Sequence, residues 1–108
     1  MEKCIKKIGI IGAMDSEISV LRSIMKENGS LKQTEAGNCT FNEGVINGVS
    51  AVVVKSGVGK VNAALCAQRL ILQFGVDAVI NTGIAGAMGG NLCIFDMAVS
   101  TDAVYHDM

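Results

Sequence analysis

Short apolar runs alternate along this chain with stretches that show helical hydrophobic spacing. Residues 5–12, 51–55 and 77–81 are runs rich in β-branched side chains, which predicts strands that are covered on both faces. Residues 18–25 and 61–71 carry apolar side chains three and four positions apart, which is typical of amphipathic helices. This alternation predicts an α/β fold, with a mixed, largely parallel central sheet flanked by helices.

Turn and cap residues indicate where these elements begin and end. Asp15 or Ser16 is expected to cap the first helix, and Gly29 follows the last apolar position of that helix. Residues 39–50 are predicted to form a strand, a tight turn at Asn47–Gly48 and a second strand. We expect a last strand towards the end of the chain, over residues 96–101.

Composition narrows the class of protein and of partner. The 108 residues are at most one domain, half of them are hydrophobic and only 18% are charged, as in a globular chain with a filled core. A net charge of −1 gives no reason to expect a nucleic-acid or membrane partner, and no apolar run reaches the length of a membrane span. The four cysteines form no close pair, so we expect free, mostly buried thiols in a reducing cytoplasm and no metal site.

Three glycine-containing segments follow the three apolar strands: GAMDSE at residues 12–17, SGVGK at 56–60 and NTGIAGA at 81–87. In parallel sheets, ligands bind in the loops beyond the carboxyl ends of the strands. We therefore expect these three loops to converge on one site.

Neither familiar phosphate-binding motif fits these loops. A dinucleotide fingerprint needs GxGxxG, whereas the first loop offers Gly9, Gly12 and then Ala13. A P-loop needs glycine at the position of Val54 and serine or threonine at that of Val61. No nucleotide cofactor is predicted.

Two chemistry-bearing side chains have both a structural and a catalytic interpretation. Glu17 is an acid in the first turn of a predicted helix, where the helix dipole favours negative charge. The same carboxylate, held at a strand end beside glycine loops, is also well placed to act as a general base on water. His106 is the only histidine, and a lone histidine is more often structural than catalytic.

Four segments taken together carry a family resemblance: GIIGAMDSEISVL, SGVGKVNAA, NTGIAGA and VSTDAVYHD. In this order and spacing they resemble the N-terminal half of the 5′-methylthioadenosine/S-adenosylhomocysteine nucleosidases, in the nucleoside phosphorylase superfamily. The resemblance implies hydrolysis of the N-glycosidic bond of adenine thioribosides, without metal or cofactor.

The resemblance also assigns roles to individual residues. It implies that Glu17 activates the attacking water, that Met14 lies near the ribose and that Val58 lines an alkylthio pocket. It places the backbone of Ala85 and Gly86 beside the ribose and purine. Ile84 stands where many relatives carry serine, and Phe95 stands where the family usually has glycine before Asp96.

On this resemblance, residues 1–108 are the N-terminal part of a single nucleosidase domain whose C-terminal half is absent. The missing half would hold the acid that protonates adenine and the glutamate that binds the ribose hydroxyls. We therefore expect the chain to be weak or inactive alone, and to form a homodimer or to self-associate. Two alternatives stay open: a purine nucleoside phosphorylase relative, and a non-catalytic remnant that binds a nucleoside or only dimerises.

Overall fold

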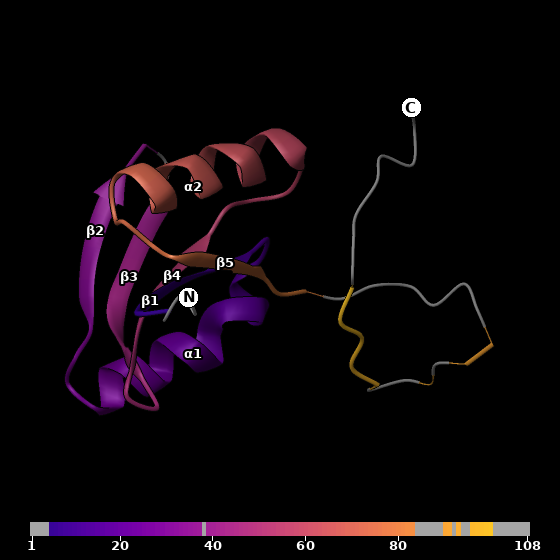
Figure 1. Ribbon diagram of the computed structural model, residues 1–108, viewed down its shortest axis with the longest axis horizontal. Helices are drawn as coiled ribbons and strands as arrows, with labels where there is room; N and C mark the ends of the chain where they lie inside the picture. The colour runs from indigo at the N-terminus through magenta and orange to yellow at the C-terminus, as the bar shows by residue number, and fades with distance from the viewer. Residues whose placement is uncertain (1–4, 38, 84–89, 92, 94–95, 101–108) are drawn as a thin grey trace, which may run out of the picture.

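The computed structural model describes residues 5–37, 39–83, 90–91, 93 and 96–100. The described part of the chain contains a five-stranded sheet and two helices (Figure 1). In chain order the elements are β1 (Lys7–Gly12), α1 (Asp15–Glu27), β2 (Lys32–Ala36), β3 (Cys39–Ile46), β4 (Val49–Lys55), α2 (Lys60–Leu72) and β5 (Ala78–Asn81).

The sheet is mixed, and its strand order is β2-β3-β4-β1-β5. β1 lies between β4 and β5 and pairs in parallel with both of them. β2, β3 and β4 form an antiparallel meander. The predicted α/β class, with a mixed sheet flanked by helices, is confirmed. The chain segments from β1 to β4 and from β4 to β5 each contain one helix, which is usual in a crossover between parallel strands.

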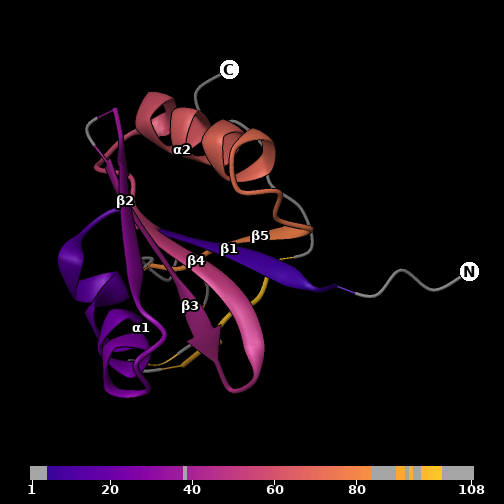
Figure 2. The same ribbon diagram turned by 90° about the vertical axis from the view of Figure 1, so that its left-hand side faces the viewer.

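The helices cover opposite faces of the sheet, with α2 above it and α1 below it in Figure 1, and the turned view in Figure 2 agrees. Successive side chains of β1 and β4 point to alternate faces, so each strand supplies both cores. One core faces α2 and contains Ile11, Phe41, Val52, Val54, Cys66, Leu70 and Phe74. The other faces α1 and contains Ile10, Ile18, Met25, Ala51 and Val53. The expectation that strands are covered on both faces is therefore confirmed for β1 and β4. It is wrong for β5 among the described residues, because Val79 and Ile80 are 39% and 48% exposed at the edge of the sheet.

Two predicted turns are present with the backbone geometry that their residues favour. Asn47 and Gly48 both have positive φ, 49° and 78°, as the tight turn between β3 and β4 requires. Gly29 follows α1 with φ of 75°. Its N–H donates to the Lys26 carbonyl, and the N–H of Ser30 donates to the Met25 carbonyl, which completes a Schellman end.

Three further features differ from the sequence-based expectation. The residue before α1 is Met14, and neither Asp15 nor Ser16 caps the helix because both already lie in its first turn. β2 was not predicted, since its sequence KQTEA lacks an apolar face. Residues 96–100 were predicted to begin a strand, but they have no strand partner among the described residues and form none. Neither α1 nor α2, the helices of the described residues, could span a lipid bilayer.

Candidate functional site

The three loops converge where the parallel strands end, as far as the structure describes them. The N–H of Ser56, just beyond β4, donates to the Gly12 carbonyl at 2.8 Å. The N–H of Thr82, just beyond β5, donates to the Ile11 carbonyl at 2.9 Å. These two bonds extend the parallel pairing past the strand ends, so the starts of all three loops lie at one edge of the sheet.

Glu17 places its carboxylate at this edge. Its Oε2 accepts hydrogen bonds from two main-chain amides, the N–H of Ala13 at 2.6 Å and the N–H of Met14 at 3.2 Å. The Glu17 N–H in turn donates to the Met14 carbonyl at 3.1 Å. The first N–H groups of a helix region lack partners within the helix, and a carboxylate satisfies them and is stabilised by the helix dipole. The side chain therefore folds back over the start of α1 instead of extending into solvent.

Two glycines leave the space in which this carboxylate lies. A Cβ atom at Gly83 would lie 3.3 Å from Glu17 Oε1, so this oxygen faces the loop that follows β5. A Cβ atom at Gly12 would lie 2.6 Å from Ile18 Cγ2 and 3.0 Å from Glu17 Cβ. Any side chain at position 12 would push α1 away from the end of β1. Sequence reasoning did not single out Gly12 and Gly83 as residues that shape the site, although the glycine content of both loops was the available signal.

The remaining candidate residues are placed as follows. The Met14 side chain is exposed, and the main-chain N–H of Met14 donates to the Glu17 carboxylate. Val58 is 75% exposed in the loop between β4 and α2, so its side chain is open to solvent. Ile84, Ala85 and Gly86 lie outside the described residues, as do Phe95 and His106.

An ion pair joins two of the converging segments. Lys55 Nζ, at the end of β4, lies 3.2 Å from Asp15 Oδ2, in the first turn of α1. Both side chains are largely exposed, so the pair contributes little to stability. The pair does give Asp15 a role different from the predicted cap, because its carboxylate reaches across to the sheet.

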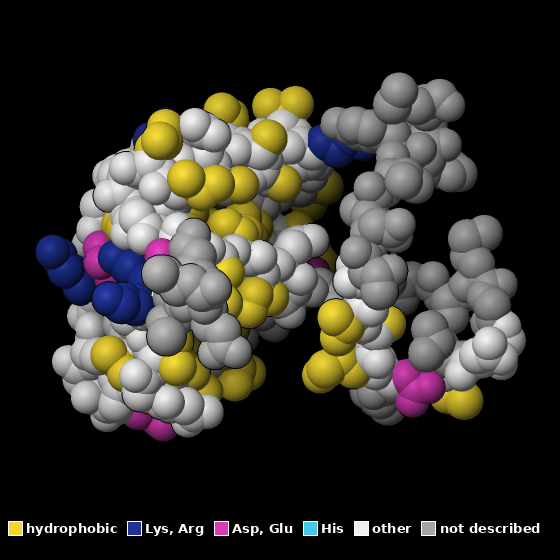
Figure 3. All heavy atoms as spheres, in the orientation of Figure 1, with side chains coloured by type: hydrophobic (Ala, Val, Ile, Leu, Met, Phe, Trp, Pro, Cys, Tyr) yellow, Lys and Arg dark blue, Asp and Glu magenta, His cyan; other side chains and the backbone are white. Residues whose placement is uncertain are grey.

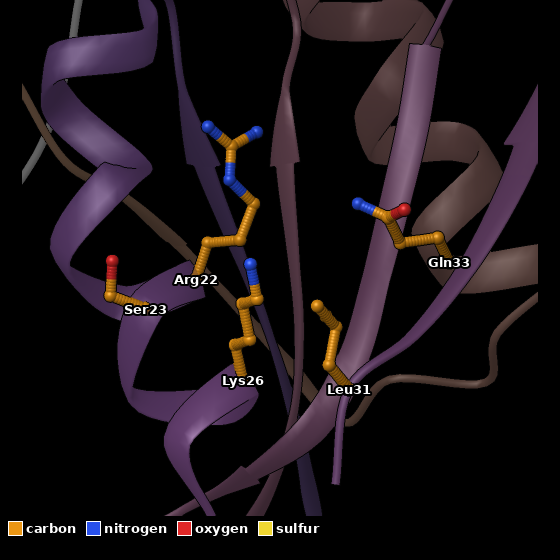
Figure 4. Close-up of a pocket in the computed structure, with 5 residues that line it drawn as sticks. All are labelled: Arg22, Ser23, Lys26, Leu31 and Gln33. Atoms are coloured by element: carbon orange, nitrogen blue, oxygen red, sulfur yellow. The ribbon is translucent and has the colours of Figure 1, made fainter. Parts of the chain in front are cut away.

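A separate hollow of about 350 Å³ lies between the second half of α1 and β2 (Figure 4). It is lined by Arg22, Ser23, Lys26, Leu31 and Gln33. Glu17 stands near the opposite end of α1, so this hollow is not part of the candidate site. No group of three or more histidine, cysteine or acidic side chains suited to a metal ion occurs in the described part of the chain.

The chemistry available at this edge is that of a positioned base. One oxygen of Glu17 is fixed by two amides, and the other faces Gly83, which carries no side chain. A carboxylate held in this way can accept a proton from a water molecule bound between the loops.

Nearly the whole chain matches known proteins. Residues 7–108 match the model of the phosphorylase superfamily. A 5′-methylthioadenosine/S-adenosylhomocysteine nucleosidase from Anoxybacillus flavithermus is 42% identical over 101 residues, which are 94% of this chain and 42% of the relative. The chain thus spans less than half the length of this curated relative.

Solved structures give the same result. A nucleosidase of the same name from Colwellia psychrerythraea, in complex with adenine, superimposes with a TM-score of 0.77 at 42% identity, over 83% of this chain and 36% of that one. One from Neisseria meningitidis, in complex with methylthio-immucillin-A, superimposes with a TM-score of 0.75 at 40% identity, over 82% and 37% of the two chains.

Proposed function

Because the chain belongs to the phosphorylase superfamily, we propose that it forms the water-activating part of an N-glycosidic hydrolase. Its substrates would be 5′-methylthioadenosine and S-adenosylhomocysteine, and its products adenine and the thioribose. The names of the relatives support the reaction class, and the adenine and the nucleoside analogue bound to two solved relatives support a nucleoside site. The position of Glu17 is the observation that carries the proposal for this chain.

In the proposed reaction, Glu17 accepts a proton from water as the water oxygen bonds to C1′ of the ribose. The bond between C1′ and N9 of adenine breaks with its electron pair moving to the base, and an acid must deliver a proton to the departing purine. The main-chain amides of Ala13 and Met14 hold Oε2, which leaves Oε1 to contact the water. Fixing a base in this way lowers the entropy lost on reaching the transition state.

We also propose binding roles for the exposed apolar residues near this edge. Met14 would contact the ribose, and Val58 would line the alkylthio pocket. The family resemblance further suggests that the backbone of Ala85 and Gly86 contacts the nucleoside, with Ile84 in place of the usual serine. The exposure of Met14 and Val58 supports this role, because apolar side chains at a site mouth are available to cover a thioalkyl group.

The acid that protonates adenine is proposed to lie in the part of the relatives that residues 1–108 do not match. We therefore expect the 108-residue chain to release adenine far more slowly than a complete relative. A chimera, in which residues 1–108 replace the matching segment of the Anoxybacillus flavithermus nucleosidase, should restore rapid release.

The test is adenine release from 5′-methylthioadenosine by both proteins, with and without inorganic phosphate. Hydrolysis predicts that the chimera forms adenine and methylthioribose at a rate that phosphate does not change. A phosphorylase would need phosphate and would form the sugar 1-phosphate. A chimera that folds but releases no adenine under either condition would favour a non-catalytic, nucleoside-binding chain.

We further propose that the chain associates with a second copy of itself. Apolar side chains gather over α2 in the space-filling view (Figure 3), and Val61, Leu65 and Leu72 are each more than half exposed. Exposed apolar patches of this kind mark protein interfaces. Sedimentation velocity should show dimers or larger species, and Leu65→Lys should shift the distribution to monomer. A wild-type chain that stays monomeric throughout the micromolar range would contradict the proposal.

A further inference from the structure

Two cysteines that are distant in the sequence lie against one another in the fold. Cys39 is the first residue of β3, and Cys66 lies on the face of α2 that packs on the sheet. Their sulfur atoms are 3.2 Å apart, and both thiols are free. A separation of 27 residues gives no sign in the sequence that these two thiols form a pair.

We propose that Cys39 and Cys66 form a reversible disulfide, so that this pair is a redox modification site of the chain. A disulfide needs a sulfur separation of about 2.05 Å, so the two atoms must approach by roughly 1.2 Å. Cys39 is well placed for such a movement. It pairs with Ala36 at the turn end of the β2–β3 hairpin, whereas the pairing of β3 with β4 begins only at Phe41.

The two thiols differ in exposure, which assigns them different roles. Cys39 is partly exposed, whereas Cys66 is 1% exposed. Burial, reinforced by the hydrogen bond with Cys39, raises the pKa of the Cys66 thiol to about 12. Because Cys39 is the more exposed of the two, it is the thiol that a dissolved oxidant reaches first, and the buried Cys66 is the thiol that attacks second.

A cation stands beside the pair. Arg69 is one turn along α2 from Cys66, and its positive charge lowers the pKa of that thiol, against the larger effect of burial. Its guanidinium reaches the β2–β3 turn, where a Cβ atom at Gly37 would lie 3.1 Å from Nη2. Positive charge at this position favours the thiolate form of Cys66, through which its attack on Cys39 proceeds.

The oxidant that we propose is a small disulfide such as oxidised glutathione. The Cys39 thiolate attacks one sulfur of this disulfide, which forms a mixed disulfide and releases one small thiolate. Cys66 then loses its proton and attacks Cys39 Sγ, which displaces the second small thiolate. The net reaction converts two protein thiols and one small disulfide into one protein disulfide and two small thiols. The resulting bond would join the start of β3 to the middle of α2.

The test is equilibration of the 108-residue chain in glutathione buffers, followed by acid quenching and intact-mass analysis. Closure of the pair removes two hydrogen atoms, a loss of about 2 Da, and reduction with dithiothreitol should restore the mass. Trypsin separates the cysteines, because Cys39 falls in the peptide 33–55 and Cys66 in the peptide 61–69. We expect these two peptides to be joined.

Comparison of folded and unfolded chain shows whether the fold is responsible. The glutathione ratio at half-oxidation should correspond to an effective thiol concentration at least tenfold higher in buffer than in concentrated urea. Cys66→Ser should trap a glutathione adduct on Cys39, and the control Cys93→Ser, at an exposed position, should leave closure unchanged. A wild-type chain that keeps the glutathione adduct, joins other peptides or closes equally well in urea would overturn the proposal.

Discussion

Glu17→Gln is expected to lower the rate of adenine release by the chimera at least about 100-fold, the lower end of the usual contribution of a general base. Glutamine has the same shape, and its amide oxygen can still accept the hydrogen bonds that the N–H groups of Ala13 and Met14 donate to Oε2. The substitution removes the basic oxygen that faces Gly83 and leaves the start of α1 intact. Initial rates with saturating 5′-methylthioadenosine measure the effect on kcat.

The matched control is Asp15→Asn. Asp15 lies in the same helical turn and carries the same charge, but its carboxylate pairs with Lys55 and is exposed. Loss of the Asp15 charge should change the rate of adenine release by less than about threefold. It should change the free energy of unfolding by no more than about 1 kcal/mol. Equal losses of activity in the two variants would show that the rate depends on negative charge at the start of α1, and not on a base at position 17. A Glu17→Gln chimera with a near-normal kcat would remove Glu17 from the proposed mechanism.

Phe41→Ala is expected to be the most damaging single truncation in the core, with a cost of about 3–5 kcal/mol in the free energy of unfolding. Phe41 is fully buried at the centre of the core that faces α2, and its ring stacks on Phe74 with 4.7 Å between centroids. Removing the ring leaves a cavity between the meander and α2. A small domain has only about 5–15 kcal/mol of stability, so the loss is a large fraction of the total.

Urea unfolding followed by circular dichroism measures this cost for the 108-residue chain. Val45→Ala is the control in the same strand, since Val45 is 40% exposed and its truncation should cost less than about 1 kcal/mol. Phe41→Leu retains most of the apolar volume, so its loss in free energy of unfolding should fall between those of the two alanine variants. This variant gives a measurable value even if Phe41→Ala does not fold. Equal midpoints for Phe41→Ala and Val45→Ala would contradict the assigned core.

The elements that could be predicted from the sequence are those whose side chains carry a burial pattern. β1 and β4 are buried on both faces and read as apolar runs, and the two helices show apolar spacing. β2 has the sequence KQTEA and lies at the edge of the sheet, where main-chain pairing with β3 holds it. A strand held in this way leaves no periodic signal in its side chains. The meander therefore had one more strand than hydrophobic patterning could detect.

The location of the candidate site could be predicted from the sequence, but the orientation of the Glu17 carboxylate in it could not. The rule that ligands bind beyond the carboxyl ends of parallel strands was enough to bring the three loops together. The same sequence rules favoured Asp15 or Ser16 as the cap, because short polar side chains are preferred there. In the structure the longer side chain of Glu17 supplies that acceptor. This choice depends on the backbone path through Gly12, which residue spacing alone does not determine.

The two amides that hold Glu17 belong to the main chain, and this affects how freely the neighbouring positions can vary. Residues 13 and 14 can exchange their side chains without losing either hydrogen bond, because every amino acid except proline supplies the same N–H. Mutation can therefore reshape the mouth of the site while the carboxylate keeps its orientation. The side chains at these two positions are therefore free to vary, whereas Gly12 has little freedom to change, because a Cβ atom there would lie 2.6 Å from Ile18 Cγ2.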